Sequence, residues 1–555
     1  MIFKSLIRQV TNAEHSRVAL EQGGHAGFGH PVDCTCDNIL MNEFSRLARV
    51  NGAFFGGSIP FIWKHMRDLQ PLIPLLPEPT RVDTEVSRRE SASSEWKRFQ
   101  LYSSQIECLT FEDSELETFG PQYRSIFLQY SRAKEFFPKL KSINLSSTHV
   151  LPQFLASLPQ LHHIDFDFSQ DGPEEQVYIT TTTRCLVGKQ LGSLLVKLSL
   201  SQQPISNISK LTNLKLLHIK IGSSLRADDL SLLSLLPKLT DLTIEHVDDQ
   251  HIFPLVVHNV AQKSFPARPC TQPSLKSLTI QGDGYAQHLI ACSISPGNLT
   301  SLHLRVTHTA RYPDRIFSLY HALRFHAIRN TQLEELEVSC HKMELVDKVV
   351  MDGIRQRTVV DANIFLAPLS KLTMLKRLHW DSAPAIDLFL VQKICDNLRH
   401  LKNLEDLWLD VGPFGRREAN SYYPPLQCLE NLCRYNTELK LARVLVDLSQ
   451  IPTTPPRIQP GSKLRMLYIE SNVFMTSDHS DRSMAMAEYL DTLFPVLESL
   501  SSHEETLLEM AGYNTQVWHE VRKLLAMYQG DRKKALICGP SSDSESDSDD
   551  EETSG

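Results

Sequence analysis

One short apolar pattern recurs along most of this sequence: an apolar residue, two residues, a second apolar residue, one residue and a third apolar residue. The last two positions alternate with polar ones, which is typical of a half-buried β-strand. The twelve clear copies are Ile106-Leu109-Phe111, Leu140-Ile143-Leu145, Leu161-Ile164-Phe166, Leu195-Leu198-Leu200, Leu214-Leu217-Ile219, Leu239-Leu242-Ile244, Leu275-Leu278-Ile280, Leu299-Leu302-Leu304, Leu333-Leu336-Val338, Leu375-Leu378-Trp380, Leu404-Leu407-Leu409 and Leu464-Leu467-Ile469. Degraded copies lie at Leu441-Val444-Val446 and near Leu497-Leu500. The pattern predicts one strand in each repeat.

The segments between these strands often have helical spacing. Leu388, Val391, Ile394, Leu398 and Leu401 form one apolar face at offsets of three and four residues. Units of a strand and a returning helix are typical of leucine-rich repeats, which stack so that neighbours bury one another's apolar side. The sequence therefore predicts an α/β leucine-rich-repeat solenoid over residues 101–510, with a curved parallel sheet inside and helices outside.

The two ends of the chain differ from the repeats. We expect a helix within residues 511–537 to cap the last repeat, because Val517, Val521 and Leu525 share one face and Gly530 offers an end. Residues 538–555 are a Ser/Asp/Glu tail with the composition of a disordered segment. At the other end we expect a poorly ordered segment over 1–39, a small helical module over 40–77 and a flexible linker over 78–100.

Short segments near both ends of the chain carry a resemblance to a known family. The residues concerned are Phe44-Ser-Arg-Leu47-Ala-Arg-Val50-Asn-Gly-Ala-Phe54, Trp63, the Leu- and Pro-rich run 69–77, Trp96-Lys-Arg-Phe99-Gln-Leu-Tyr102, Tyr489-Leu-Asp-Thr-Leu-Phe494-Pro495 and Val517-Trp518-His-Glu-Val521. Together they resemble the F-box-like leucine-rich-repeat proteins that are abundant in mushroom-forming fungi. The resemblance implies that the module docks on a Skp-type adaptor of a cullin ubiquitin ligase, while the repeats hold a substrate. The implied adaptor contacts are Leu47, Val50, Phe54, Ile59 and Trp63.

The opening half of that module departs from the family pattern. An F-box normally begins with a Leu-Pro pair and an acidic-apolar helix, whereas this chain has the glycine-rich run from Gly23 to Pro31, a poor helix former. Two other interpretations therefore stay open. One is a leucine-rich-repeat scaffold with no ubiquitin role, and the other is an acidic-tailed regulator of a GTPase or of a basic nuclear protein.

Charge is distributed unevenly along the chain. Lys and Arg number 57 against 65 Asp and Glu, which gives a formal net charge of -8. Seven of the acids lie within Ser541–Gly555, which has no Lys or Arg, so the rest of the chain is almost neutral. This balance disfavours a basic nucleic-acid-binding protein. Ser542, Ser544, Ser546 and Ser548 each have an acid three residues on, which makes them candidate phosphorylation sites; the alternative is a tail that only aids solubility.

The predicted concave strand face is acidic. Of the residues flanking the two strand apolars in the twelve copies, eleven are acids and four are bases. We expect a basic protein segment to bind there, with the alternative that the charge only keeps a solvated surface soluble. The predicted binding residues are Asp165, Asp167, Asp241, Glu245, Glu335, Glu337, Asp381, Asp406, Trp408, Asp410, Tyr468 and Glu470, and the aromatic members are expected to act as exposed anchors.

No catalytic or cofactor-binding motif is found in the sequence. The phosphate-binding, dinucleotide-binding, zinc-protease and nucleophile-elbow patterns are absent. His25, His30, Cys34 and Cys36 form a weak zinc pattern, because only one residue separates the cysteines. An odd number of cysteines and the lack of a signal peptide or an apolar run of about 20 residues favour reduced thiols and a cytoplasmic or nuclear protein without membrane spans. We expect neither enzyme activity nor a cofactor.

Overall fold

The computed structural model describes residues 58–66, 70–75, 91–111, 137–146, 148, 150, 152–168, 172–200, 202–221, 230–246, 270–282, 290, 293–306, 323, 326, 329–340, 367–382, 397–411, 424–452, 461–471, 480–502 and 516–538. The chain divides into two compact units, Met1–Leu161 and His162–Gly555. The predicted zinc residues, the adaptor contacts Leu47, Val50 and Phe54, and the tail serines lie outside the described residues.

The first unit contains three parallel strands. They are β1 (His65–Met66), β2 (Cys108–Phe111) and β3 (Ser142–Leu145), accompanied by η1 (Gln70–Leu75), α4 (Ser91–Ser103) and α8 (Pro152–Ser157). Their core includes Phe99, Phe137 and Phe154, which meet edge to face with ring centroids 6.3 and 6.1 Å apart. Such contacts between aromatic rings stabilise a core beyond the area they bury.

This unit corrects two expectations about the N-terminal region. The parallel sheet already begins at β1, inside the segment assigned to a helical F-box-like module, and the carbonyl of Lys64 accepts N–H bonds from Glu107 and Cys108 as in the later repeats. Helix α4 occupies residues that were expected to form a flexible linker. Sequence polarity suggested the linker, but helix formation places the buried Phe99 in the core, and tertiary packing of this kind overrides local composition.

The second unit contains a parallel sheet of twelve described strands, which pair in sequence order. The order is β4 (His163–Phe166), β5 (Ser193–Leu200), β6 (Leu216–Ile221), β7 (Asp241–His246), β9 (Ser277–Gly282), β11 (Ser301–Val306), β12 (Glu335–Cys340), β13 (Arg377–Ser382), β14 (Asp406–Val411), β15 (Leu441–Val446), β16 (Met466–Ser471) and β17 (Ser499–Ser502). A separate parallel pair joins β8 (Cys270–Gln272) and β10 (Ile294–Pro296). The predicted all-parallel α/β architecture is confirmed.

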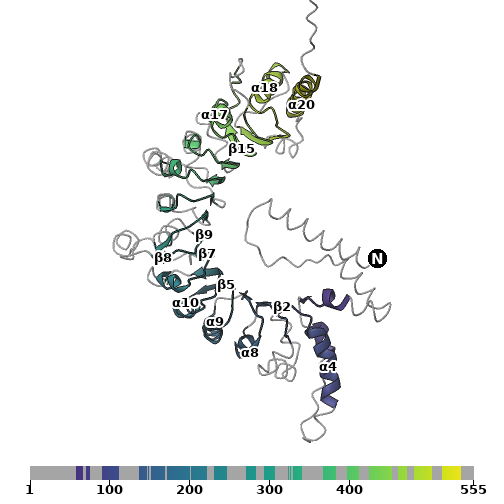
Figure 1. Ribbon diagram of the computed structural model, residues 1–555, viewed down its shortest axis with the longest axis vertical. Coiled ribbons are helices and arrows are strands. Elements are labelled where there is room, and N and C mark those ends of the chain that lie inside the picture. The colour runs from purple at the N-terminus through teal and green to yellow at the C-terminus, as the bar shows by residue number, and fades with distance from the viewer. Residues whose placement is uncertain are drawn as a thin grey trace, which may run out of the picture. The chain divides into compact units, whose positions relative to one another are not determined.

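Helices and 3-10 turns connect these strands. They are α9 (Pro173–Cys185), α10 (Gln202–Ile208), η3 (Leu232–Leu235), η4 (Ala367–Lys371), α17 (Cys428–Tyr435), α18 (Ser480–Leu493) and α20 (Gln516–Cys538). In Figure 1, α9, α10 and α17 lie on the same side of the row of strands in this unit. We call the opposite side of the sheet the open face.

A repeated backbone contact defines the register. In most repeats the residue after the first apolar position offers its carbonyl to two consecutive N–H groups of the next repeat; for example, Glu334 O accepts from Lys376 N at 2.8 Å and from Arg377 N at 3.0 Å. In eleven of the twelve clear copies the three apolar side chains are at most 5% exposed. Paired backbone groups and buried apolar positions thus recur together, as a stacked repeat requires.

Two repeats have a different register from the one predicted. In β5 the core positions are Leu191, Leu194 and Val196, with an irregularity between Val196 and Ser199. In β15 they are Leu439, Ala442 and Val444. The observed core positions lie four residues earlier than predicted in β5 and two residues earlier in β15, and because both shifts are even the same face of each strand points to the core. Arg443, between Ala442 and Val444, lies on the open face in register with Tyr468.

The last helix is longer than predicted. Helix α20 continues through Gly530 to Cys538, and its buried side chains Val517, Trp518, Val521 and Leu525 follow helical spacing. Arg532 pairs with Asp491 of α18. A glycine in a helix interior costs about 1 kcal/mol relative to alanine, so this packing outweighs the local preference to end the helix there.

Candidate functional site

The open face between β11 and β16 carries three rows of side chains in register. The first row is Ser301, Glu335, Arg377, Asp406, Leu441 and Met466. The second row is His303, Glu337, His379, Trp408, Arg443 and Tyr468. The third row includes Arg305, Ser339, Asp381 and Asp410. Adjacent strands lie about 4.8 Å apart, so neighbours within a row are in contact range.

Acids and bases alternate across these strands and pair with one another. Glu337 accepts from His303 Nδ1 at 2.7 Å and from Arg305 Nε at 3.0 Å. Glu335 accepts from Arg377 Nη2 at 3.0 Å, and His379 Nε2 lies 3.1 Å from Asp406 Oδ2. These acids were predicted to be free for a basic partner. The structure shows that bases on neighbouring strands already neutralise much of their charge.

The pairing shifts the pKa values of the central groups. Burial disfavours the charged imidazole of His303, but hydrogen bonds to Glu335 and Glu337 outweigh burial and raise its pKa. Burial likewise opposes ionisation of Glu337, yet hydrogen bonds from His303 and Arg305 lower its pKa to about 2. Burial also opposes ionisation of Glu335, but a hydrogen bond from His303 and the charges of His303 and Arg377 lower its pKa. The cluster is therefore stable as a set of ion pairs.

Ser301, His303 and Glu337 have the spacing of a nucleophile, a base and an orienting acid. Ser301 Oγ lies 2.6 Å from His303 Nε2, and His303 Nδ1 lies 2.7 Å from Glu337. However, Ser301 Oγ also donates to Glu335 at 3.1 Å, and two carboxylates favour the protonated imidazole, which cannot act as a base. The backbone N–H of Ser301 is bonded to Lys276 O, so it is not available to stabilise an oxyanion.

We therefore expect no hydrolysis from this trio. The wild-type protein and its Ser301→Ala variant should hydrolyse p-nitrophenyl acetate at equal rates, because the hydroxyl serves the ion-pair cluster and is not activated. The release of p-nitrophenolate between pH 6 and 9 measures this. Lower rates in both Ser301→Ala and Glu337→Gln would instead identify a working triad.

An aromatic sandwich lies beside the ion pairs. The guanidinium carbon of Arg443 is 4.6 Å from the ring centroid of Trp408 and 4.5 Å from that of Tyr468. His379 lies on the other side of Trp408, with ring centroids 5.9 Å apart. Trp408 and Tyr468 were predicted to be exposed anchors for a partner. Both are only partly exposed, and they hold an arginine of the same chain between them.

The predicted acids on the earlier strands lie in more local pairs. Asp165 is only 2% exposed and lies 3.8 Å from Lys197 Nζ, which bonds Asp167 at 2.7 Å. Glu245 is 3.9 Å from His218, and Asp241 accepts a hydrogen bond from Thr240. Because Asp165 is buried, it offers no charge to a partner. Asp381 is partly exposed, while the side chains of Asp410 and Glu470 lie outside the described residues.

Two predicted adaptor contacts are described. Ile59 is 5% exposed. Trp63 packs against Tyr102 of α4, with ring centroids 4.7 Å apart. Ile59 is therefore buried within the first unit, whereas Trp63 is partly exposed beside α4.

Three residues of the open-face rows were missed by sequence reasoning. His303 and His379 occupy the same flanking positions as the predicted acids, but an uncharged histidine was not counted. Arg443 was missed because its repeat is a degraded copy and only the twelve clear copies were counted. Among the described residues no group of three or more His, Cys, Asp or Glu side chains could hold a metal ion. In that same part of the chain, no helix has both the length and the apolar character needed to cross a membrane.

Comparisons with known proteins gave matches for this chain among solved structures alone. No protein-family model matches it, and no curated protein does. Among solved structures, a similar chain is an internalin from Listeria monocytogenes, with 13% sequence identity over 68% of this chain and 80% of that chain and a TM-score of 0.27. The assignment of the fold rests on the strand register and on the buried repeat positions of this chain.

Proposed function

We propose that this chain is a non-enzymatic protein-binding scaffold, and that its open face between β11 and β16 is the binding surface. The observation that supports this is the preorganisation of the three rows. Most of the polar side chains in the first two rows contact a residue on a neighbouring strand, so a partner meets a surface whose conformations are already restricted. Preorganisation lowers the entropic cost of binding.

The charge of this surface favours a basic partner. By sequence, the strands β11 to β16 contain three arginines, Arg305, Arg377 and Arg443, and six acids, Glu335, Glu337, Asp381, Asp406, Asp410 and Glu470. These six strands thus carry three more acids than arginines. Electrostatic complementarity mainly sets specificity and association rate, so we infer a protein segment rich in Lys and Arg.

Charge reversal on the open face tests this proposal. We expect the Asp381→Lys/Asp406→Lys variant to bind a labelled Lys/Arg-rich peptide at least tenfold more weakly than the wild type and with a shallower salt dependence. Fluorescence anisotropy at 50 and 200 mM NaCl measures both. The matched control is Glu174→Lys/Glu488→Lys, which changes the net charge equally at exposed positions of α9 and α18. Equal losses in the two variants would show that only net charge matters.

A finer assignment, the substrate receptor of a cullin-type ubiquitin ligase, draws on the N-terminal resemblance. Its support is the run containing Leu47, Val50 and Phe54. The burial of Ile59 and the packing of Trp63 against Tyr102 weaken this assignment, because both side chains make contacts within the first unit itself. Co-expression of the full chain with a Skp-type adaptor tests it: co-purification that is lost in Leu47→Ala/Phe54→Ala would support the ligase role, and no co-purification would favour a plain scaffold. The same proposal would put the protein in the cytoplasm or nucleus, consistent with Cys185 and Cys433, which form no disulfide within the described residues.

A further inference from the structure

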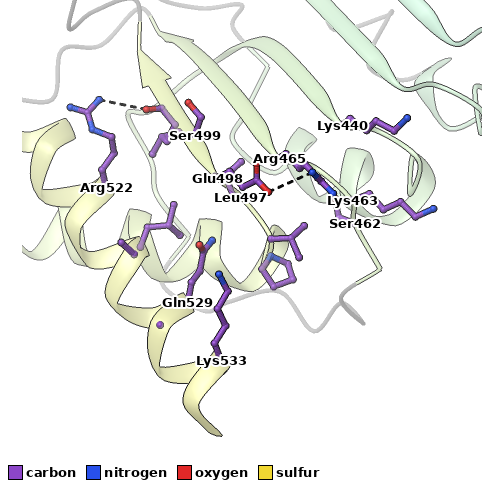
Figure 2. A pocket seen from close by; sticks show the side chains of 16 residues that line it. Lys440, Ser462, Lys463, Arg465, Leu497, Glu498, Ser499, Arg522, Gln529 and Lys533 are labelled. Atoms are coloured by element: carbon purple, nitrogen blue, oxygen red, sulfur yellow. Dashed lines mark hydrogen bonds and ion pairs between the residues drawn. The ribbon is translucent and has the colours of Figure 1, made fainter. Parts of the chain in front are cut away.

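A pocket of about 1070 Å³ lies at the C-terminal end of the second unit. One of its walls is a face of α20 that includes Arg522, Gln529 and Lys533, and the facing wall includes Lys463 and the segment that leads into β17. Figure 2 shows the side chains of Lys440 and Lys463 across the pocket from Gln529 and Lys533. None of these residues belongs to the open-face rows.

The pocket has a basic rim. Its charged lining residues are Lys440, Lys463, Arg465, Arg522 and Lys533, with Glu498 as the single acid among them. Arg465 lies 3.7 Å from Glu498, and two glutamates from outside the lining, Glu405 and Glu438, pair with Lys440 and Lys463 at 2.6 and 2.8 Å. Five bases thus still face only three acids.

These ion pairs leave the bases available to another anion. In the pairs of Lys440, Lys463 and Arg465 every side chain is more than 40% exposed, and exposed pairs contribute at most about 1 kcal/mol. Lys533 is exposed and forms no ion pair with any residue in the described part of the chain. An anionic segment can therefore replace or share these contacts at little cost.

A segment of matching charge follows α20 directly. The helix ends at Cys538, and the chain continues through Gly539-Pro540 to seven acids between Asp543 and Glu552, without a Lys or Arg. The fourteen residues 539–552 can span about 46 Å at ~3.3 Å per residue. Arg522 and Lys533 are separated by about 16 Å along the helix at ~1.5 Å per residue. The acidic segment is long enough to run back along the whole pocket.

We propose that the acidic segment Asp543–Glu552 folds back and binds the basic pocket between α20 and the segment leading into β17. Tethering makes this contact intramolecular, with an effective concentration of order millimolar for a short linker, so weak individual ion pairs suffice. Phosphorylation of Ser542, Ser544, Ser546 or Ser548 would add about -1.5 to -2 charges each and tighten the contact.

Zero-length crosslinking of the full chain tests the contact directly. A carbodiimide joins a carboxylate only to a lysine that it touches. We expect the monomer to carry links from the acids of 543–552 to Lys533 and Lys463, and these links to decline in 0.5 M NaCl. The Glu405–Lys440 pair is a positive control. The matched negative control is Lys534, next to Lys533 on α20, 79% exposed and not part of the pocket.

The proposal is overturned if the Glu405–Lys440 link forms but the tail links to nothing, or if it links to Lys534 as often as to Lys533. A competition measurement gives an independent check. A labelled peptide of residues 539–555 should bind at least tenfold more tightly to a variant whose seven tail acids are replaced by Asn or Gln than to the wild type, whose own tail occupies the pocket. Lys533→Glu in that variant should abolish binding, whereas Lys534→Glu should not. Equal affinity for the wild type and the neutral-tail variant would contradict the proposal.

Discussion

Replacing Trp380 with alanine is expected to lower the free energy of unfolding of the second unit by about 3–5 kcal/mol. Trp380 lies on the core side of β13 and is 1% exposed, between the repeats of β12 and β14. Its removal leaves a large cavity at the interface of three repeats, where stability depends on nearest-neighbour stacking. Chemical denaturation followed by circular dichroism measures the loss.

The neighbouring tryptophan is a matched control for this prediction. Trp408 lies on β14 but on the open face, where it is partly exposed and contacts Arg443. Trp408→Ala should cost no more than about 2 kcal/mol, because it loses a cation–π contact and a little buried area. Equal losses for the two substitutions would contradict the assignment of Trp380 to the core and of Trp408 to the opposite face.

Replacing Glu337 with glutamine is expected to destabilise the protein by about 2–4 kcal/mol near pH 5.5, since breaking a largely buried ion pair leaves its partners uncompensated. Glu337 is 17% exposed and holds both His303 and Arg305. The control is Glu334→Gln, which removes a pair with Lys376 in which both side chains are 44% exposed. That substitution should cost less than about 1 kcal/mol.

The difference in stability between the wild type and Glu337→Gln should become smaller at both low and high pH. The pKa of Glu337 is lowered from 4.5 to about 2, so its contribution is complete above pH 4.5 and is lost as the pH falls toward 2. The pKa of His303 is raised above 6.5, so its contribution is complete below pH 6.5 and is lost as the pH rises through the raised value. The stability difference should therefore be largest between pH 4.5 and 6.5. A difference that stays constant from pH 3 to 8 would argue against the ion-pair cluster.

The repeat pattern was sufficient to predict the fold class because it repeats a simple physical requirement. Most copies alternate buried and partly exposed side chains with period two, although in β4, β7, β9 and β11 the residue between the two strand apolars is buried as well, and in eleven copies all three predicted apolar residues are buried. The two failures, at Leu195-Leu198-Leu200 and Leu441-Val444-Val446, lie in runs of closely spaced apolar residues that fit the pattern at more than one position along the strand. Local alternation cannot choose between two such registers, because the choice depends on which backbone groups the neighbouring strand offers.

The candidate site was predictable only in part. Pattern alone placed Glu335, Glu337, Asp381 and Asp406 on one strand face, and the structure locates them there. The partners of Glu335, Glu337 and Asp406 were not evident, because the bases that neutralise these acids are 27 to 42 residues away in the chain and become neighbours only when the strands stack. The acidic surface inferred from counting is in consequence a network of ion pairs with a smaller residual charge.

By itself the sequence determined that this chain stacks parallel strands, which side chains alternate along most of them, and that its last residues are strongly acidic. Only the tertiary structure decided that Trp408 and Tyr468 enclose Arg443, that His303 bridges two glutamates and that bases gather opposite α20. The physical reason is the distance along the chain over which each feature is decided. Apolar period and composition are properties of a single strand or helix, whereas ion pairs, cation–π contacts and pockets depend on the spacing and register between strands.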